Sequence, residues 1–309
     1  MNQTDTLIQE IQKVIVGKEG VIKDVLMAIL AKGHILLEDI PGVGKTTLAV
    51  SFAGTLEMEY KRIQFTPDVI PSDVVGFTVY DKKTGEFVYK PGAVMCNVLL
   101  ADEINRTSSK TQAALLEVME EGSVTVDGST YQVPEPFVVI ATQNPFGSAG
   151  TQMLPQSQMD RFMVKLSMGY PDFESQINIL RERQMEQPLD SLRQIYSRED
   201  IIRMQEEVSR VEVKDKILEY ITTLAEATRD HELIQLGVSP RGALAVNNMA
   251  KACAYVENRD YVIPEDIIRI FPSVCAHRVI LHPRAKVANI PAEELMQQIA
   301  DTIKIPEVI

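Results

Sequence analysis

Several features are missing from this 309-residue sequence, and each absence excludes a class of protein. The three cysteines, Cys96, Cys253 and Cys275, are odd in number and far apart, and no two of them form a C-x-x-C pair. Neither a disulfide scaffold nor a zinc site is therefore predicted. The pattern is typical of buried thiols in a reducing compartment.

Long uncharged apolar stretches are also missing. The nearest candidate spans 21–37 and is interrupted by charged side chains, whereas a membrane-spanning helix needs about 20 mostly apolar residues. The chain opens without a basic segment ahead of an apolar run, so no secretory signal is predicted. We expect a soluble, cytoplasmic protein without stable membrane insertion.

Basic residues are outnumbered. Lysine and arginine total 31 against 43 aspartates and glutamates, which gives a net charge of −12 distributed over both halves of the chain. A protein that wraps a nucleic-acid backbone needs a basic face, so the bulk charge argues against nucleic acid as a partner while leaving room for a local patch. The composition, 45% hydrophobic, is that of a globular protein, and the length favours two domains.

The first half of the chain alternates short apolar runs with helical patterns, which predicts an α/β fold with a parallel sheet and helices on both faces. Strands are expected over 34–38, 62–65, 98–101, 137–141 and 163–166, with helices such as 47–56 and 110–120 between some of them. Two further pairs of runs flank turn residues and predict β-hairpins inserted between core elements, at 77–89 and 123–133.

After Tyr170 the pattern changes to helical periodicity, and strand-like runs become scarce. Segments often opened by Ser, Pro or Asp predict helices over 173–186, 198–209, 214–229, 240–257, 264–271 and 291–303. We predict two domains, an α/β core at 1–170 and a helical domain at 171–309, with the boundary somewhere within 168–190.

A glycine-rich loop follows the first strand and opens a helix, with the sequence Ile40-Pro41-Gly42-Val43-Gly44-Lys45-Thr46-Thr47. Glycines let the backbone wrap phosphates, and the helix N-terminus supplies amide donors and a positive dipole. In such a loop Lys45 reaches the β- and γ-phosphates of ATP, and the Thr46 hydroxyl ligates Mg²⁺. The strict pattern has a glycine six residues before the lysine, where this chain has Asp39, a modest departure.

Two other strand ends carry polar residues suited to hydrolysis. Asp102, after the strand at 98–101, is placed to hold Mg²⁺ through water, and Glu103 could polarise the attacking water as general base. Asn144, after the strand at 137–141, can sense the γ-phosphate. Each residue alone is also compatible with a structural role, but in this order after the loop they predict ATP hydrolysis.

Five segments in this order resemble the MoxR family of AAA+ ATPases, namely 38–46, 100–106, 141–145, 159–162 and 237–241. The resemblance covers nearly the whole chain. It implies an AAA+ core and an all-helical lid that bind ATP and Mg²⁺ in a homo-hexameric ring. It also implies that Asn144 is the first sensor, Arg161 an arginine finger for the adjacent subunit's nucleotide and Arg241 the second sensor, and that Val16 and Gly17 line the adenine pocket.

Two arginines of these segments, Arg161 and Arg106, are open to more than one interpretation from the residues alone. Arg161 could equally form a local ion pair with the adjacent Asp160. Arg106, in the segment 100–106, could support the subunit interface or cap a local carboxylate.

For function, the resemblance implies an ATP-driven, chaperone-like remodeller or maturation factor of partner proteins, working with a separate partner that carries a von Willebrand factor A domain. Alternatives are a magnesium-chelatase-like motor that assists metal insertion and a nucleotide-switched scaffold. In ring relatives such hairpins face the pore or the substrate; alternatively, both hairpins simply cover surface edges. The segment 120–137 lacks lysine and arginine and contains Glu120, Glu121, Asp127 and Glu135, which disfavours a DNA motor.

Overall fold

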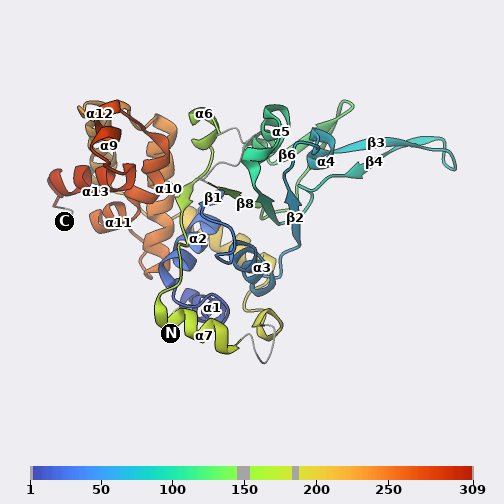
Figure 1. Ribbon diagram of the computed structural model, residues 1–309, viewed down its shortest axis with the longest axis horizontal. Coiled ribbons are helices and arrows are strands. Elements are labelled where there is room, and N and C mark those ends of the chain that lie inside the picture. The colour runs from blue at the N-terminus through green and yellow to red at the C-terminus, as the bar shows by residue number, and fades with distance from the viewer. Residues whose placement is uncertain (1–2, 145–153, 183–187, 308–309) are drawn as a thin grey trace.

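The computed structural model describes residues 3–144, 154–182 and 188–307 of the chain. Its centre is a five-stranded parallel sheet in the order β2-β5-β8-β1-β9 (Figure 1). The strands coincide with the five predicted apolar runs: β1 (Ile35–Glu38), β2 (Tyr60–Gln64), β5 (Val98–Asp102), β8 (Val138–Gln143) and β9 (Val164–Leu166). Because they are parallel, their carboxyl ends lie along one edge of the sheet.

Helices cover both faces of this sheet, as predicted. Consecutive strand residues point to opposite faces, so Leu36 and Leu99 join one buried apolar cluster and Leu37 and Leu100 another. Helix α5 (Ser109–Glu121) packs on the first face, where Leu115 and Leu116 belong to the first cluster. The second cluster includes side chains of three helices from the start of the chain: α1 (Gln3–Gln12), α2 (Glu19–Leu30) and α3 (Lys45–Thr55).

Both predicted hairpins are present, one formed by β3 (Gly76–Asp81) and β4 (Glu86–Pro91), the other by β6 (Ser123–Val126) and β7 (Ser129–Gln132). The β3–β4 hairpin, which follows the short helix α4 (Pro71–Val75), projects far from the body of the molecule (Figure 1). The two hairpins touch, because Thr78 hydrogen-bonds Asp127 and the rings of Tyr89 and Tyr131 stack with centroids 4.0 Å apart.

The second half is helical, as predicted. Two of its helices begin at serine N-caps, Ser197 and Ser239. The helix predicted at 173–186 is described over Phe173–Glu182, and the rest of that prediction lies outside the described residues. The helices are α6 (Gln156–Met159), α7 (Phe173–Glu182), α8 (Arg198–Ser209), α9 (Asp215–Arg229), α10 (Pro240–Val256), α11 (Pro264–Cys275), α12 (Pro283–Val287) and α13 (Ala292–Thr302), with 3₁₀ turns η1 (Ile104–Arg106), η2 (Pro188–Ser191) and η3 (Ala276–Arg278) in the chain.

A short antiparallel ladder of β10 (Ile234–Leu236) and β11 (Ile280–Leu281) lies among these helices and was not predicted. The second apolar cluster continues from the sheet into α10, α11 and α13, so the helical region shares its core with α1 and α2. The domain division at 170/171 stays a prediction. Among the described residues, no helix combines the length and apolarity needed to cross a bilayer, and Cys96, Cys253 and Cys275 are buried free thiols.

Candidate nucleotide site

The glycine-rich loop connects β1 to α3 at the carboxyl edge of the sheet. Gly42 and Gly44 have φ angles of 87° and 95°, in the left-handed region that glycine adopts without steric cost. A Cβ built on Gly42 would meet nothing within 4 Å, so the loop backbone faces open space there. Gly44 is the N-cap of α3, whose first amides have no acceptor within the helix. The loop therefore forms a cradle suited to an anion.

Lys45 folds back over this loop. Its Nζ donates hydrogen bonds to the main-chain oxygens of Asp39 at 2.8 Å and Ile40 at 3.4 Å. Burial lowers the pKa of Lys45, while the nearby carboxylates of Asp39, Asp102 and Glu103 act in the opposite direction. Thr46 and Thr47, in the first turn of α3, are both partly exposed.

Asp39, the departure from the strict loop pattern, connects the loop to the segment after β9 through hydrogen bonds. Its carboxylate is buried, with a residue exposure of 5%. It accepts hydrogen bonds from the Ser167 hydroxyl at 2.8 Å, the Met168 amide at 2.6 Å and the Gly169 amide at 3.0 Å. A glycine at position 39 would leave these donors without this acceptor. This contact between the loop and the segment after β9 could not be predicted from the sequence pattern.

A cavity of about 690 Å³ adjoins the loop. Its walls come from the α1–α2 connection, the loop itself, the segment 168–171 and α7, and they include Val14, Val16, Lys18, Gly42, Gly44, Tyr170, Gln176 and Ile179. Val16 is thus a lining residue. Gly17 is not among the lining residues; it is exposed, and a Cβ at its φ of 72° would fall 2.3 Å from Ser175 Oγ.

The two predicted carboxylates lie at the end of β5, beside the end of β8. The Thr142 hydroxyl donates to Asp102 Oδ1 at 2.7 Å and accepts from the Glu103 amide at 2.9 Å. Asp102 Oδ2 is 2.6 Å from Arg62 Nη2 on β2. Glu103 has a positive φ of 56°, and its Oε2 is 2.6 Å from Arg106 Nη1. This contact fits the interpretation of Arg106 as a cap for a local carboxylate, and its support of a subunit interface stays a prediction.

Asn144 directly follows β8 at the same edge of the sheet, and Pro145 of the same segment lies outside the described residues. The preceding Gln143 donates to Glu38 Oε1 at 2.7 Å, which links the ends of β8 and β1. These strand ends carry the loop, the carboxylates and Asn144 on one edge.

Arg161 and Arg241 meet at a single carboxylate away from this cavity. Arg161 Nη1 is 2.9 Å from Glu120 Oε2 and also donates to the Leu116 main-chain oxygen, while Arg241 Nη2 is 2.6 Å from Glu120 Oε1. Asp160 pairs with Arg278 at 2.9 Å. The local Asp160–Arg161 pair is therefore not the arrangement found, and Glu120, grouped above with the acidic hairpin, is the partner that the sequence did not reveal.

The comparisons with known proteins agree with this arrangement. Residues 34–164 match the ATPase family associated with various cellular activities (AAA), and residues 226–299 match the AAA lid domain. The protein YeaC of Bacillus subtilis is 50% identical, over 97% of this chain and 93% of its own length. Chaperone MoxR1 of Mycobacterium tuberculosis is 38% identical, over 97% and 82%. The chain belongs to the MoxR family of AAA+ ATPases.

A solved structure supports the same conclusion for the fold. The crystal structure of a putative ATPase from Cytophaga hutchinsonii superposes on this MoxR-family chain with a TM-score of 0.92 at 38% identity, covering 99% of this chain and 95% of that one. The predicted α/β core followed by a helical lid is confirmed. The AAA match contains the loop, both carboxylates, Asn144 and Arg161, and the lid match contains Arg241.

Proposed function

We propose that this MoxR-family chain hydrolyses ATP with Mg²⁺ at the carboxyl edge of its sheet. The observation that carries the proposal is the meeting of the glycine cradle, the Lys45 ammonium and the carboxylates of Asp102 and Glu103 at that edge. Lys45 would hold the β- and γ-phosphates, with the amides of 42–47 around them. Glu103 would accept a proton from the attacking water, and Asn144 would orient that water.

The residues present fit a magnesium ion that is shared with the nucleotide. The described residues contain no group of three or more His, Cys, Asp or Glu side chains able to hold a metal by themselves. Mg²⁺ is usually bound by one or two protein ligands together with substrate phosphates and water. Thr46 and Asp102 would be those ligands, and the ion would neutralise charge on the phosphates.

Substitution of Glu103 tests the hydrolytic assignment. Glu103→Gln keeps the size of the side chain and removes the base, so ATP binding should be retained while turnover falls by about 100-fold or more. Glu121→Gln, at an exposed position at the end of α5, is the matched control and should leave turnover unchanged. Retained turnover in Glu103→Gln would exclude Glu103 as the base. No turnover in the unaltered protein would favour a nucleotide-switched scaffold.

We further propose a homo-hexameric ring in which Arg161 reaches the nucleotide of the adjacent subunit. In support, the cavity beside the loop is lined by neither Arg161 nor Arg241, which instead share Glu120. An arginine supplied by another subunit stabilises transition-state charge by a factor of about 10³–10⁵ in rate. Arg241 pairs with the same Glu120 carboxylate and therefore lies beside Arg161.

Mixed rings test this assignment. Arg161→Ala alone should depress turnover strongly although its own loop is intact, and Lys45→Ala alone should be inactive. Mixing the two should restore part of the activity, because Lys45→Ala subunits still offer Arg161 to their neighbours. Sedimentation should give hexamers for each variant. If the mixture stays inactive, Arg161 does not act between subunits.

The substrate that we propose is a partner protein. The β3–β4 hairpin exposes large apolar side chains far from the core: Phe77 is 50%, Tyr80 53% and Phe87 76% exposed. Exposed apolar groups of this kind suit contact with another protein. The name of the Mycobacterium tuberculosis relative, Chaperone MoxR1, supports the same class of activity. We place the protein in the cytoplasm, with a partner carrying a von Willebrand factor A domain.

Isolation of ATP-trapped rings from the native host tests the substrate class. Glu103→Gln rings should retain partner proteins, and the added change Phe87→Ser should reduce their recovery, whereas Tyr261→Ser, at an exposed aromatic of the lid, should not. DNA, single-stranded or duplex, should leave the ATPase rate unchanged, and clear stimulation would favour a nucleic-acid motor. ATP-dependent metal insertion into a tetrapyrrole, with the cognate large subunit, would favour the chelatase alternative.

A further inference from the structure

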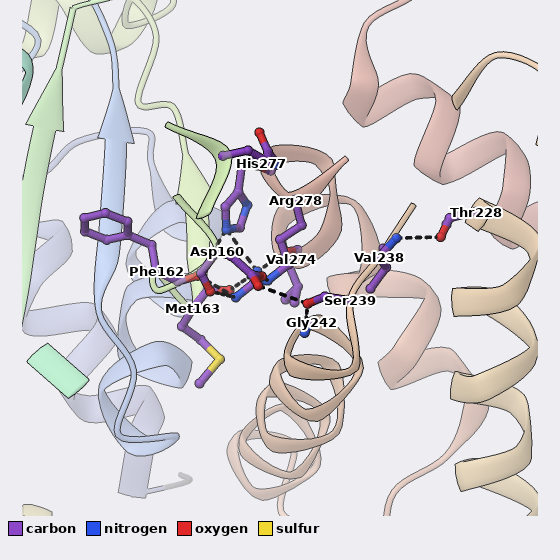
Figure 2. A network of polar contacts seen from close by, with 11 residues as sticks. Asp160, Phe162, Met163, Thr228, Val238, Ser239, Gly242, Val274, His277 and Arg278 are labelled. Atoms are coloured by element: carbon purple, nitrogen blue, oxygen red, sulfur yellow. Dashed lines mark hydrogen bonds and ion pairs between the residues drawn. The ribbon is translucent and has the colours of Figure 1, made fainter. Parts of the chain in front are cut away.

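A buried arginine stands behind the predicted arginine finger. Arg278 of η3 has a side chain only 2% exposed, and it forms an ion pair with Asp160 Oδ1 at 2.9 Å (Figure 2). The same guanidinium donates to the main-chain oxygens of Phe162 at 2.6 Å and Met163 at 3.1 Å. It also donates to the Asp160 main-chain oxygen at 3.3 Å, and thus holds the backbone on both sides of Arg161. A planar guanidinium with five donors suits such a multiple contact.

The other oxygen of Asp160 holds the start of a lid helix. The Ser239 hydroxyl donates to Asp160 Oδ2 at 3.0 Å and accepts from the Gly242 amide at 3.1 Å, which makes Ser239 the N-cap of α10 (Figure 2). Arg241 stands in the first turn of this helix. Asp160 therefore contacts both the residue that caps the Arg241 helix and the arginine that fixes the Arg161 backbone.

The packing around Gly242 leaves little freedom between these parts. A Cβ at this position would fall 2.9 Å from Arg278 Cδ and 2.7 Å from Val238 Cγ1. Val238 in turn donates its amide to Thr228 Oγ1 of α9 at 2.9 Å (Figure 2). The start of α10 is consequently held against Arg278 on one side and against α9 on the other.

We propose that Asp160, Ser239 and Arg278 are positioning residues that hold the Arg161 segment and the start of α10 as one unit, so that a movement of the lid moves the finger offered to the neighbouring subunit. Arg161 and Arg241, which stand at the two ends of this unit, both pair with Glu120. This inference rests on the proposed action of Arg161 between subunits. Its distinguishing consequence is that damage to the unit harms the neighbour's site rather than the subunit's own.

Two substitutions of nearly equal size separate the contact with Asp160 from helix capping. Asp and Asn are both good N-caps, so Ser239→Asp and Ser239→Asn should each keep the start of α10. The Asn amide can donate to Asp160, whereas the Asp side chain brings a second carboxylate against it. Thermal unfolding should confirm that both variants fold.

The assay uses the mixed rings of Lys45→Ala donors and Arg161→Ala acceptors. Ser239→Asp in the donor should lower the restored kcat at least tenfold with little change in KM for ATP. The same substitution in the acceptor should lower the restored kcat less than twofold. Ser239→Asn should be close to the parental mixture in either position. Equal losses in donor and acceptor, or no loss in the donor, would overturn the inference.

A further variant keeps the test decisive if Ser239→Asp does not fold. Ser239→Gly removes the hydrogen bond to Asp160, and glycine still caps a helix acceptably. In the donor it should lower the restored rate at least threefold, and in the acceptor it should not. Equal losses in donor and acceptor, or no loss in the donor, would again overturn the inference. An inactive parental mixture, with no change at Ser239, would instead refute the action of Arg161 between subunits, and the inference would fall with it.

Discussion

Replacing Asp39 by glycine would restore the strict phosphate-loop pattern, and we predict that it weakens the protein. The carboxylate accepts three hydrogen bonds from the segment 167–169 while almost fully buried. Asp39→Gly would leave the buried amide of Met168 and the part-buried amide of Gly169 without this acceptor, and a buried donor without a partner costs about 1–3 kcal/mol. The free energy of unfolding should therefore fall by about 1–4 kcal/mol.

The same change should loosen the nucleotide cavity. Met168, Gly169, Tyr170 and Pro171 form part of its wall, and Asp39 is the side chain that fastens this segment to the loop. We expect the Kd for ATP to rise about tenfold, which corresponds to about 1.4 kcal/mol. The Lys45 contact should survive because it uses the main-chain oxygen at position 39, so kcat should change less than KM.

Urea unfolding, titration with a fluorescent ATP analogue and steady-state kinetics would measure these effects. Asp39→Asn, whose amide keeps one acceptor oxygen, should fall between the parent and Asp39→Gly in all three. Asp68→Asn, at an exposed position, is the control for loss of a negative charge. If Asp39→Gly were as stable as the parent and bound ATP as well, the carboxylate would not fasten the cavity wall.

Three more predictions concern single side chains. Gly17→Ala should lose about 1–3 kcal/mol of stability because its φ is 72° and the Cβ would clash with Ser175, whereas Gly20→Ala, with open space in α2, should gain about 0.5–1 kcal/mol; equal effects in thermal melts would contradict this. Burial lowers the pKa of His34 from 6.5 to about 4, so between pH 6.5 and pH 4 the unfolded chain binds more protons than the folded chain. The free energy of unfolding should therefore fall as the pH falls through this range, by about 2 kcal/mol between pH 7 and 5. His34→Gln should remove that part of the slope in urea unfolding at the two pH values, and identical slopes would exclude His34 as its source. Glu120→Gln should raise the ATPase rate of the ring at sub-saturating ATP by up to about fivefold, since half-exposed ion pairs are worth about 0–1 kcal/mol; a lower rate would show that Glu120 supports the arginines rather than competing for them.

The sheet and the loop could be predicted because their signals are local. Strands β1, β5 and β8 contain buried runs of consecutive apolar residues such as 98–101, whereas β2 and β9 carry charged residues within shorter apolar patterns, and the hairpins are marked by turn residues between alternating runs. The loop at 40–47 is a contiguous pattern in which each residue type has a defined task toward phosphate. The ladder of β10 and β11, with three and two residues, is too short for alternation to be seen.

The polar contacts of the site could not be predicted, because their partners are far apart in the sequence. Asp39 meets a segment more than 120 positions away, and Arg241 meets Glu120 across a similar separation. Asp160 and Arg161 are adjacent in the sequence but do not pair with each other: Asp160 pairs with Arg278, and Arg161 pairs with Glu120. Arg106 and Glu103, three residues apart around η1, were the exception, since a turn brings such neighbours together.

The excess of acidic residues can be related to particular contacts of arginine side chains. Arg62 and Arg106 pair with the carboxylates of Asp102 and Glu103, and Arg161 and Arg241 share Glu120 away from the cavity. The phosphates of ATP carry more negative charge than one carboxylate, and Mg²⁺ competes for the carboxylates in turn. Nucleotide that binds between subunits would then take the place of the carboxylates as the ionic partner of these arginines. Its binding would not simply fill a site of unpaired positive charges. Such an exchange changes which elements are held together. In the proposed ring, the contacts of Glu120 and Asp160 with the lid are therefore where we expect hydrolysis at one site to be converted into movement of the subunits.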